Sequence, residues 1–278
     1  MRVVRHLDGQ SFLQAARSWL LRAEAKNNLI LGNAPGIGAP SPAGIAPYLA
    51  CVYDNSEIVG CAMRTPPHKL VITQMPLSAV TTLVDDVAAF YRTLPGVAGP
   101  DASTAAFADV WSTRSGERTI RAGRQRIYQI ERVTRPSRVA SGALRLARES
   151  DAALLAGWIA AFAAEATPDE RVDAAEAARH RIAYGMLFLW EDPEPVSMAA
   201  WSGKTPNGVR VNLVYTPPSL RSRGYATTCV GALTRRLLEQ GSRFCFLFTD
   251  LANPTSNSIY QQLGYRPVSD TASYAFMS

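Results

Sequence analysis

The residues best suited to chemistry lie in a single turn, residues 215–226, with the sequence YTPPSLRSRGYA. Before it, the alternation of apolar and polar residues predicts a strand over 209–215, and the apolar spacing after it predicts a helix over 227–240. The unpaired N–H groups and the dipole at the start of such a helix favour a bound phosphate. Gly224 allows a close approach of the backbone, and Arg221 and Arg223 add positive charge. The turn therefore predicts a phosphate or pyrophosphate site.

Two motifs in this half of the chain resemble those of a known superfamily. Arg221, Gly224 and Ala226 match the signature Gln/Arg-x-x-Gly-x-Gly/Ala of the GNAT superfamily of acyl-CoA N-acyltransferases. The later stretch 253–265, NPTSNSIYQQLGY, resembles the second GNAT motif, an Asn-led helix that carries a Tyr and ends in Leu-Gly-aromatic. The resemblance covers residues 142–278.

The resemblance implies acetyl-CoA as acyl donor and a direct attack of an amine on its thioester. The strand edge at Leu213, Val214 and Tyr215 would splay from its neighbour and bind the pantetheine arm. A backbone N–H near Val214 or Tyr215 would stabilise the developing oxyanion. The residues implied to hold the pyrophosphate are Arg221, Ser222, Arg223, Gly224, Tyr225, Ala226 and Thr227.

The second motif implies three further site residues. Asn253 would bond the pantetheine amides, with Asn257 one turn later as a second candidate. Tyr260 would lie near the sulfur and donate a proton to the leaving thiolate. Two structural alternatives stay open, since Asn253 could serve as the cap of its helix and Tyr260 as packed core.

The resemblance requires a general base for the attacking amine, and several carboxylates compete for this role. Glu165 ends a predicted helix where relatives line the acceptor site, so it is the tentative base. Glu191 and Asp250, each at the end of a predicted strand, are the competitors. Asn212 is expected to point opposite to Leu213 and to contact the acceptor.

The order of predicted elements is the same in the two halves of the chain. We therefore expect an α/β (α+β) protein of two GNAT-like domains, residues 1–135 and 142–278, each a mixed, mostly antiparallel sheet flanked by helices. The first half has VITQMPLS over residues 71–78, where its cofactor turn should lie, with no Gly and no Arg. The chain thus resembles tandem GNAT proteins with a degenerate N-terminal half that has lost acyl-CoA binding.

Composition sets the compartment and excludes several classes. No apolar run reaches the length of a membrane span and no signal-peptide core is present, so we expect a cytoplasmic protein without a membrane partner. The four cysteines show no metal-ligand spacing, which predicts buried, reduced thiols and no metal. The oligomeric state is not encoded in any pattern.

The net charge of +6 comes from an arginine-rich stretch, residues 114–138. A solvated strand and linker is the favoured interpretation, and we expect no nucleic acid partner. A phosphate-tracking patch is the alternative, although no nucleic-acid-binding motif accompanies it. The arginines concerned are Arg114, Arg118, Arg121, Arg124, Arg126, Arg132, Arg135 and Arg138.

The resemblance thus favours an N-acetyltransferase that acts on a primary amine of a small molecule or peptide. The alternative is a non-catalytic acyl-CoA sensor or scaffold, and a nucleotide-binding protein is disfavoured because no P-loop or dinucleotide fingerprint occurs. The acceptor is not specified. Five acids could favour a cationic amine, or could belong to a solvated helix pair. They are Glu165, Asp169, Glu170, Asp173 and Glu176.

Overall fold

The computed structural model describes residues 1–38, 44–136, 138–166 and 172–277. The chain divides into two compact units, unit 1 (Met1–Ile127 with Val268–Ser278) and unit 2 (Tyr128–Pro267). Both units are built from mixed sheets with helices on both faces, as the sequence predicts for an α/β protein. The units also share the order of their first strands and helices.

Unit 1 has the strand order β1-β2-β3-β4-β5-β12-β6, in which β4 and β5 are parallel and β1–β2, β2–β3, β3–β4 and β5–β12 are antiparallel. Its strands are β1 (Arg2–Arg5), β2 (Tyr48–Asp54), β3 (Glu57–Arg64), β4 (Leu70–Ile72), β5 (Gly96–Pro100), β6 (Arg118–Ile130) and β12 (Arg266–Met277). Its helical segments are α1 (Gly9–Leu21), α2 (Asn28–Asn33), η1 (Ala34–Gly36), α3 (Leu77–Phe90) and α4 (Asp101–Ser115).

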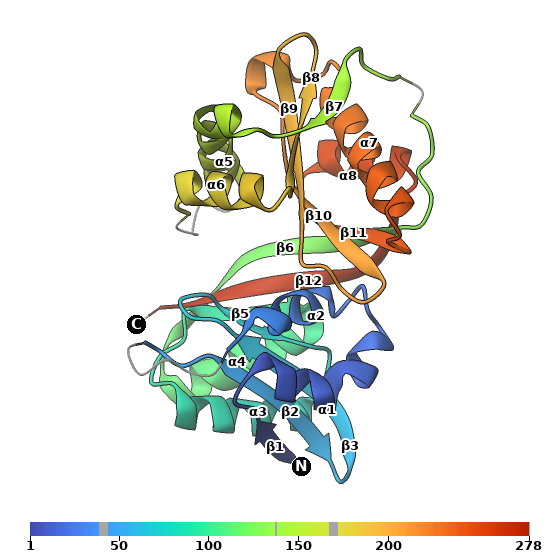
Figure 1. Cartoon of the computed structure of the whole chain (residues 1–278). Coiled ribbons are helices and arrows are strands. Elements are labelled where there is room, and N and C mark those ends of the chain that lie inside the picture. Colours follow the sequence, from blue (N-terminus) through green and yellow to red (C-terminus); the bar gives the residue numbers. More distant parts are fainter. Residues whose placement is uncertain (39–43, 137, 167–171, 278) are drawn as a thin grey trace. The chain divides into compact units, whose positions relative to one another are not determined.

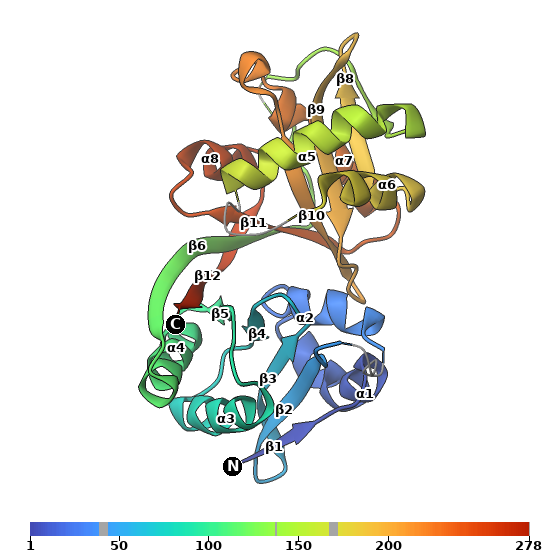
Figure 2. The same cartoon turned by 90° about the vertical axis from the view of Figure 1, so that its left-hand side faces the viewer.

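Two apolar clusters hold unit 1 together, one on each face of its sheet. Helices α1 and α2 cover one face, and α3 and α4 cover the other (Figure 2). On the α4 side, Trp111 stacks between Phe107 and Phe276 of β12. Burial of large aromatic side chains is a major stabilising term, so β12 is an integral part of this core.

The last strand of the chain completes unit 1. β12 pairs antiparallel with β5 from Thr271 opposite Pro100 to Ala275 opposite Gly96, and it lies between β5 and β6. Residues 268–278 therefore group with unit 1, whereas the sequence assigns them to the second half. In turn, the last residues of β6, 128–130, group with unit 2.

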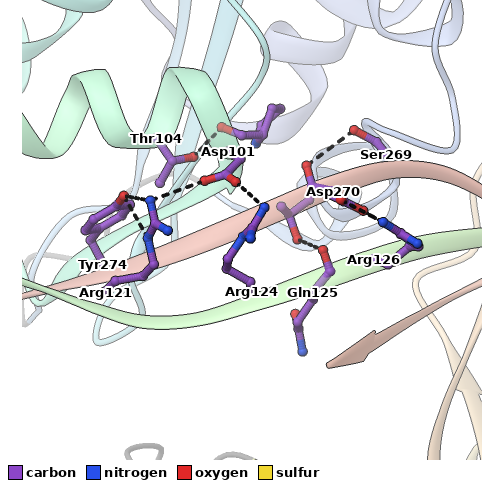
Figure 3. Close-up of polar contacts among 11 residues, drawn as sticks. Asp101, Thr104, Arg121, Arg124, Gln125, Arg126, Ser269, Asp270 and Tyr274 are labelled. Carbon is purple, nitrogen blue, oxygen red and sulfur yellow. Dashed lines mark hydrogen bonds and ion pairs between the residues drawn. The ribbon is translucent and has the colours of Figure 1, made fainter. Parts of the chain in front are cut away.

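Along β6 and β12, carboxylates and hydroxyls face the arginines of β6 (Figure 3). Arg121 and Arg124 approach Asp101 at 3.7 and 2.8 Å, and Arg126 pairs with Asp270 at 2.6 Å. Arginines that already have acidic partners are poorly suited to track a phosphate chain. These contacts support the interpretation of a solvated strand.

Unit 2 has the strand order β6-β11-β10-β9-β8-β7, in which β10 and β11 are parallel and the pairs from β10 to β7 are antiparallel. Its strands are β7 (Ala143–Leu146), β8 (Leu187–Glu191), β9 (Pro195–Ser202), β10 (Gly208–Tyr215) and β11 (Phe244–Asp250), joined by the end of β6. Its helical segments are η2 (Glu149–Asp151), α5 (Ala152–Ala166), α6 (Ala174–Ala183), η3 (Pro218–Leu220), α7 (Tyr225–Glu239) and α8 (Pro254–Gln262).

The helices of unit 2 form two layers, with α5 and α6 on one face of the sheet and α7 and α8 on the other (Figure 1). The apolar spacing recognised in the sequence of α7 buries Val230, Leu233 and Leu237 against the sheet. The strand β10 therefore has one face toward each helical layer, which places it at the centre of the unit.

The four cysteines are free and buried, as predicted. Burial raises the pKa of both Cys229 and Cys245 to about 12, so these thiols are unreactive near neutral pH. Among the described residues, none of the helices has the length and apolar character needed to cross a membrane.

Replacing Gly96 by alanine should disrupt the join between β5 and β12. An added Cβ would lie 2.0 Å from the carbonyl oxygen of Tyr274, at a φ of +150° that side chains rarely adopt. We expect Gly96→Ala to lower the free energy of unfolding by about 2–3 kcal/mol, because the strands must move apart. Urea unfolding followed by circular dichroism measures this change.

Gly116→Ala is the matched control. Gly116 follows α4 with a φ of +75°, and an added Cβ there would meet nothing within 4 Å. Only the conformational cost of about 1 kcal/mol then applies. Equal losses of stability in the two variants would contradict the close approach of β12 to β5.

Candidate functional site

A β-bulge interrupts β10 near its end. Asn212 lies opposite Ala200 of β9 and Tyr215 lies opposite Met198, so two residues of β10 face one residue of β9 between these pairs. One of the two, Leu213, has a φ of +48°, which is rare for a residue with a branched side chain. A bulge of this kind bends the strand and redirects its backbone groups.

The other neighbour of β10 departs before the bulge. The parallel ladder with β11 runs from Gly208 opposite Phe244 to Arg210 opposite Phe246 and extends no further, although β10 continues to Tyr215. Residues 211–215 thus have no ladder with β11. The end of this ladder agrees with the splay that the resemblance implies, and a role of Leu213, Val214 and Tyr215 in cofactor binding stays a prediction.

The turn after β10 ends at an open helix start. Gly224 precedes α7 with a φ of +85°, and no side chain of the described residues caps the helix. The first helical bond runs from the Thr228 N–H to the Gly224 carbonyl oxygen, so the N–H groups of residues 225–227 have no partner within the helix. A Cβ added at Gly224 would meet nothing within 4 Å. The expected strand–turn–helix is therefore present.

The arginines of the turn point in different directions. Arg221 bonds the Thr216 carbonyl oxygen through Nε at 2.9 Å and both carboxylate oxygens of Glu165 through Nη2 at 2.8 and 2.9 Å. Arg223 is exposed and reaches the Ser219 carbonyl oxygen at 3.3 Å. The structure thus joins the predicted base, Glu165, to the first arginine of the predicted phosphate turn.

Tyr225 has a partner that the sequence gave no signal for. Its hydroxyl donates to Asp192 at 3.0 Å, and Ser141 donates to the same carboxylate oxygen at 2.5 Å. The hydrogen bond to Asp192 raises the pKa of Tyr225. This contact ties the first residue of α7 to the turn between β8 and β9.

The two asparagines of the second motif are both engaged within the protein. Asn253 caps α8 by accepting from the Ser256 N–H at 3.0 Å, which confirms the capping alternative. The Asn257 amide donates to the carbonyl oxygens of Asp250 and Asn253, and its oxygen accepts from the Tyr128 hydroxyl at 3.0 Å. The predicted pantetheine contact of either side chain stays a prediction.

Tyr260 lies in the apolar cluster of α7 and α8, which Val214 and Tyr225 also contact. The residue is buried, and no described group bonds its hydroxyl. Burial raises the pKa of Tyr260 to about 12. The core alternative and the proton-donor role are therefore compatible, because the ring packs while the hydroxyl is uncommitted.

The remaining candidates for the base have partners of their own. Glu191 faces the Arg145 guanidinium at 2.9 Å, and Asp250 accepts from the Ala252 N–H at 2.8 Å. Of the five acids that could favour a cationic amine, Asp169 and Glu170 lie outside the described residues. Each of the three carboxylates thus has a partner within the protein, and the role of Glu165 as the base stays a prediction.

The prediction that Asn212 points opposite to Leu213 is wrong. Leu213 packs in the cluster of α5 and α6, which also contains Ala200, the partner of Asn212 across the ladder. Both side chains therefore lie on the α5 and α6 side of the sheet. The bulge is the reason, since an extra residue breaks the strict alternation of side chains.

The corresponding turn of unit 1 is filled by protein groups. Met75 is buried in the core, and its backbone N–H and carbonyl oxygen both bond the Ser103 hydroxyl, at 3.0 and 3.2 Å. The strands β4 and β5 stay close, because a Cβ at Gly99 would lie 2.4 Å from the Ile72 carbonyl oxygen. This geometry agrees with the predicted loss of acyl-CoA binding in the first half.

Several solved structures with a similar fold are described as GNAT proteins. An acetyltransferase of the GNAT family from Colwellia psychrerythraea has a TM-score of 0.58 and 11% identity, with 100% of both chains covered. A GCN5-related N-acetyltransferase from Sphaerobacter thermophilus has a TM-score of 0.55 and 15% identity, covering 98% of this chain and 95% of that one. A tandem GNAT protein of the clavulanic acid biosynthesis pathway has a TM-score of 0.55 and 11% identity, covering 99% and 98%.

The chain therefore has the fold of the GNAT acetyltransferases in its tandem form, and the predicted resemblance is confirmed. Residues 187–274 match the family model described as FR47-like protein. The matched span begins with β8 and includes the bulge, the Gly224 turn and α8. No curated protein matches the chain.

Replacing Asn257 by alanine tests whether its contacts are structural. We expect Asn257→Ala to lower the free energy of unfolding by about 2 kcal/mol, because the Asp250 and Asn253 carbonyls and the Tyr128 hydroxyl lose a partner. Urea unfolding in the absence of any ligand measures the loss. Gln262→Ala is the control, since that exposed amide bonds the Ser258 hydroxyl on the helix surface. Unchanged stability in Asn257→Ala would show that these bonds contribute nothing.

Proposed function

We propose that this chain is an N-acetyltransferase that moves an acetyl group from acetyl-CoA to the primary amine of a small molecule or peptide, by direct attack in a ternary complex. The observation that carries the proposal is the bulged end of β10, which leaves β11 and leads into the open start of α7. The GNAT fold supports acyl transfer in general.

The groups around Gly224 fit a diphosphate-bearing thioester. The N–H groups of residues 225–227 provide donors without helical partners, and the positive φ of Gly224 lets the turn curl around an anion. Arg221 and Arg223 contribute charge at the rim of the turn. Acetyl-CoA would supply an acyl group already activated as a thioester.

The bulge gives β10 its role in the reaction. The edge of Leu213, Val214 and Tyr215 has no ladder with β11, so it can bond the amides of a pantetheine arm. An N–H of Val214 or Tyr215 donates to the thioester carbonyl oxygen, where negative charge develops during attack. Because the backbone is fixed by the bulge, this donor needs no reorganisation.

Tyr260 assists the departure of the sulfur. A pKa of about 12 keeps its hydroxyl protonated throughout the neutral and mildly alkaline range. A thiol has a pKa of about 8.5, so the leaving thiolate is a weaker base than the Tyr260 phenolate. The hydroxyl therefore acts chiefly by hydrogen bonding to the thiolate, and no loss of activity from its ionisation is expected until the pH approaches 12.

Glu165 acts as the base, and its contact with Arg221 links it to the donor site. In this contact both carboxylate oxygens of Glu165 are occupied by the Arg221 guanidinium. A diphosphate at the turn competes for Arg221, and the Glu165 carboxylate is then released to take the proton from the ammonium group of the acceptor.

A panel of primary amines with acetyl-CoA, followed by thiol release, tests the proposal. Turnover of at least one amine, lost in Arg221→Glu, is the expected result. Coenzyme A binding in a calorimeter without turnover of any amine would instead indicate a non-catalytic acyl-CoA sensor. If coenzyme A does not bind, both the N-acetyltransferase and the acyl-CoA sensor hypotheses are wrong.

Tyr260→Phe and Tyr265→Phe form a matched pair within one cluster. Tyr260→Phe should lower kcat about a hundredfold, with coenzyme A affinity and stability unchanged, because the lost hydroxyl has no described partner. Tyr265 bonds the buried Thr234 hydroxyl at 2.8 Å, so Tyr265→Phe should cost about 1 kcal/mol of stability and leave kcat unchanged. Steady-state kinetics, calorimetry and thermal unfolding separate the two. Equal kcat values in Tyr260→Phe and the parent protein would exclude a role of this hydroxyl in the departure of the thiolate.

Glu165→Gln should change donor binding and turnover in opposite directions. Loss of the carboxylate frees Arg221, so the affinity for coenzyme A should rise by up to about fivefold, the value of an exposed ion pair. The same change should lower kcat if Glu165 is the base. Glu176→Gln, which breaks another exposed ion pair of this unit, is the control and should alter neither quantity. Weaker binding of coenzyme A in Glu165→Gln would contradict the competition for Arg221.

A further inference from the structure

A half-buried arginine, Arg181, lies on the inner face of α6, and no described residue offers it a strong acceptor. Arg181 follows Ala177 and Ala178 by four and three residues, and both alanines pack toward the sheet with Ile182. Its Nε is fully buried and has no hydrogen-bond partner among the described residues. Its Nη1 reaches the Ala177 carbonyl oxygen at 3.4 Å. A guanidinium is costly to bury unless an anion or several acceptors surround it.

On the face of the sheet that α5 and α6 cover, β10 contributes a second arginine and an amide. Arg210 and Asn212 lie two residues apart on β10, and both bond the Ser202 hydroxyl, at 3.4 and 2.7 Å. The Asn212 Oδ1 is fully buried and without a described partner. If the amide is turned over, its nitrogen becomes the unpaired atom instead. We call Arg181, Ser202, Arg210 and Asn212 the Arg181 cluster.

The charges of the two arginines in the cluster favour a bound anion. Burial lowers the pKa of Arg181, and burial together with the charge of Arg181 lowers the pKa of Arg210 to about 10. Two like charges that repel each other at a half-buried position are both stabilised by an anion between them. Arg210 also has other interactions, so the anion site is assigned to Arg181, whose Nε has no described hydrogen-bond partner.

The position of the cluster connects it to the reaction. Asn212 immediately precedes the bulge at Leu213 and faces α5 and α6, the side opposite to α7 and α8. Arg210 lies two residues further from the bulge, about 7 Å along the strand. An amine that attacks at the bulge from this side would extend its remaining atoms over Asn212 toward the arginines.

We propose that the Arg181 cluster selects the acceptor, which is an amine that also carries an oxyanion. Arg181 binds the carboxylate or phosphate of this acceptor, and Asn212 bonds a polar group between the oxyanion and the attacking nitrogen. This assignment rests on the proposed N-acetyltransferase function, and it adds the chemical class of the substrate.

Matched pairs of amines test the assignment on the full chain. The first pair is β-alanine and β-alaninamide, and the second is phosphoethanolamine and ethanolamine. We expect the anionic member of at least one pair to have a kcat/KM about ten- to hundredfold higher, the value of a hydrogen bond to a charged group. The pair that shows this preference distinguishes a carboxylate from a phosphate.

Variants on α6 identify the residue responsible. Arg181→Gln should remove the preference through a higher KM for the anionic member, with kcat and the neutral member little changed, and Arg181→Lys should restore part of it. Arg179→Gln is the control, because Arg179 lies on the exposed face of α6, paired with Glu176 at 2.9 Å. Coenzyme A affinity should be unchanged in all three variants.

The outcomes separate this assignment from the proposed function. Preference for the neutral members, or an anionic preference that survives in Arg181→Gln, would overturn the assignment while acetyl transfer stands. Calorimetry with the same four amines supplies a readout that needs no turnover. If the anionic amines bind neither alone nor with coenzyme A, the assignment is overturned, and if coenzyme A itself does not bind, the proposed function fails first.

Discussion

The candidate site depends on one backbone distortion, the bulge at Leu213. A leucine with positive φ costs roughly 1–2 kcal/mol, so the surrounding packing must hold it in place. The cluster of α5 and α6 receives the Leu213 side chain, and the pairing of Tyr215 with Met198 resumes the ladder beyond it. The strain is therefore stored by the unit that carries the site. Without it, β10 would stay paired and its N–H groups would be used up within the sheet.

The local parts of this site could be predicted from sequence because their signals are local. A strand pattern, a pair of prolines, a glycine and a helical pattern within residues 209–240 are sufficient to predict the turn at Gly224. The cap at Asn253 follows from its position before Pro254 at the start of α8. Each of these features depends on residues within one or two turns of each other, which is the range over which periodicity is informative.

Features made by distant residues could not be predicted in the same way. The pairing of β12 with β5 joins residues that are far apart in the chain and leaves no periodic trace in either segment. The ion pair of Arg221 with Glu165 and the contact of Tyr225 with Asp192 are similar, since each joins two polar residues whose pairing no local pattern indicates. The sequence contains one weak indication of the Arg181 cluster. The polar residues Arg210 and Asn212 alternate with Val209 and Val211 on a central strand. A strand buried on both faces would have apolar residues at these positions as well.

The pairing of β12 also has a consequence for how the chain acquires its structure during synthesis. The ribosome produces residues 1–127 first, yet the strand that lies between β5 and β6 is translated only after the whole of unit 2. Until then, β5 has a neighbour only on its β4 side, and Trp111 lacks the ring of Phe276. The nascent first unit thus exposes an unfinished sheet edge throughout the translation of the second, a state in which chains are prone to associate. Unit 1 can therefore complete its sheet only after β12 has been synthesised.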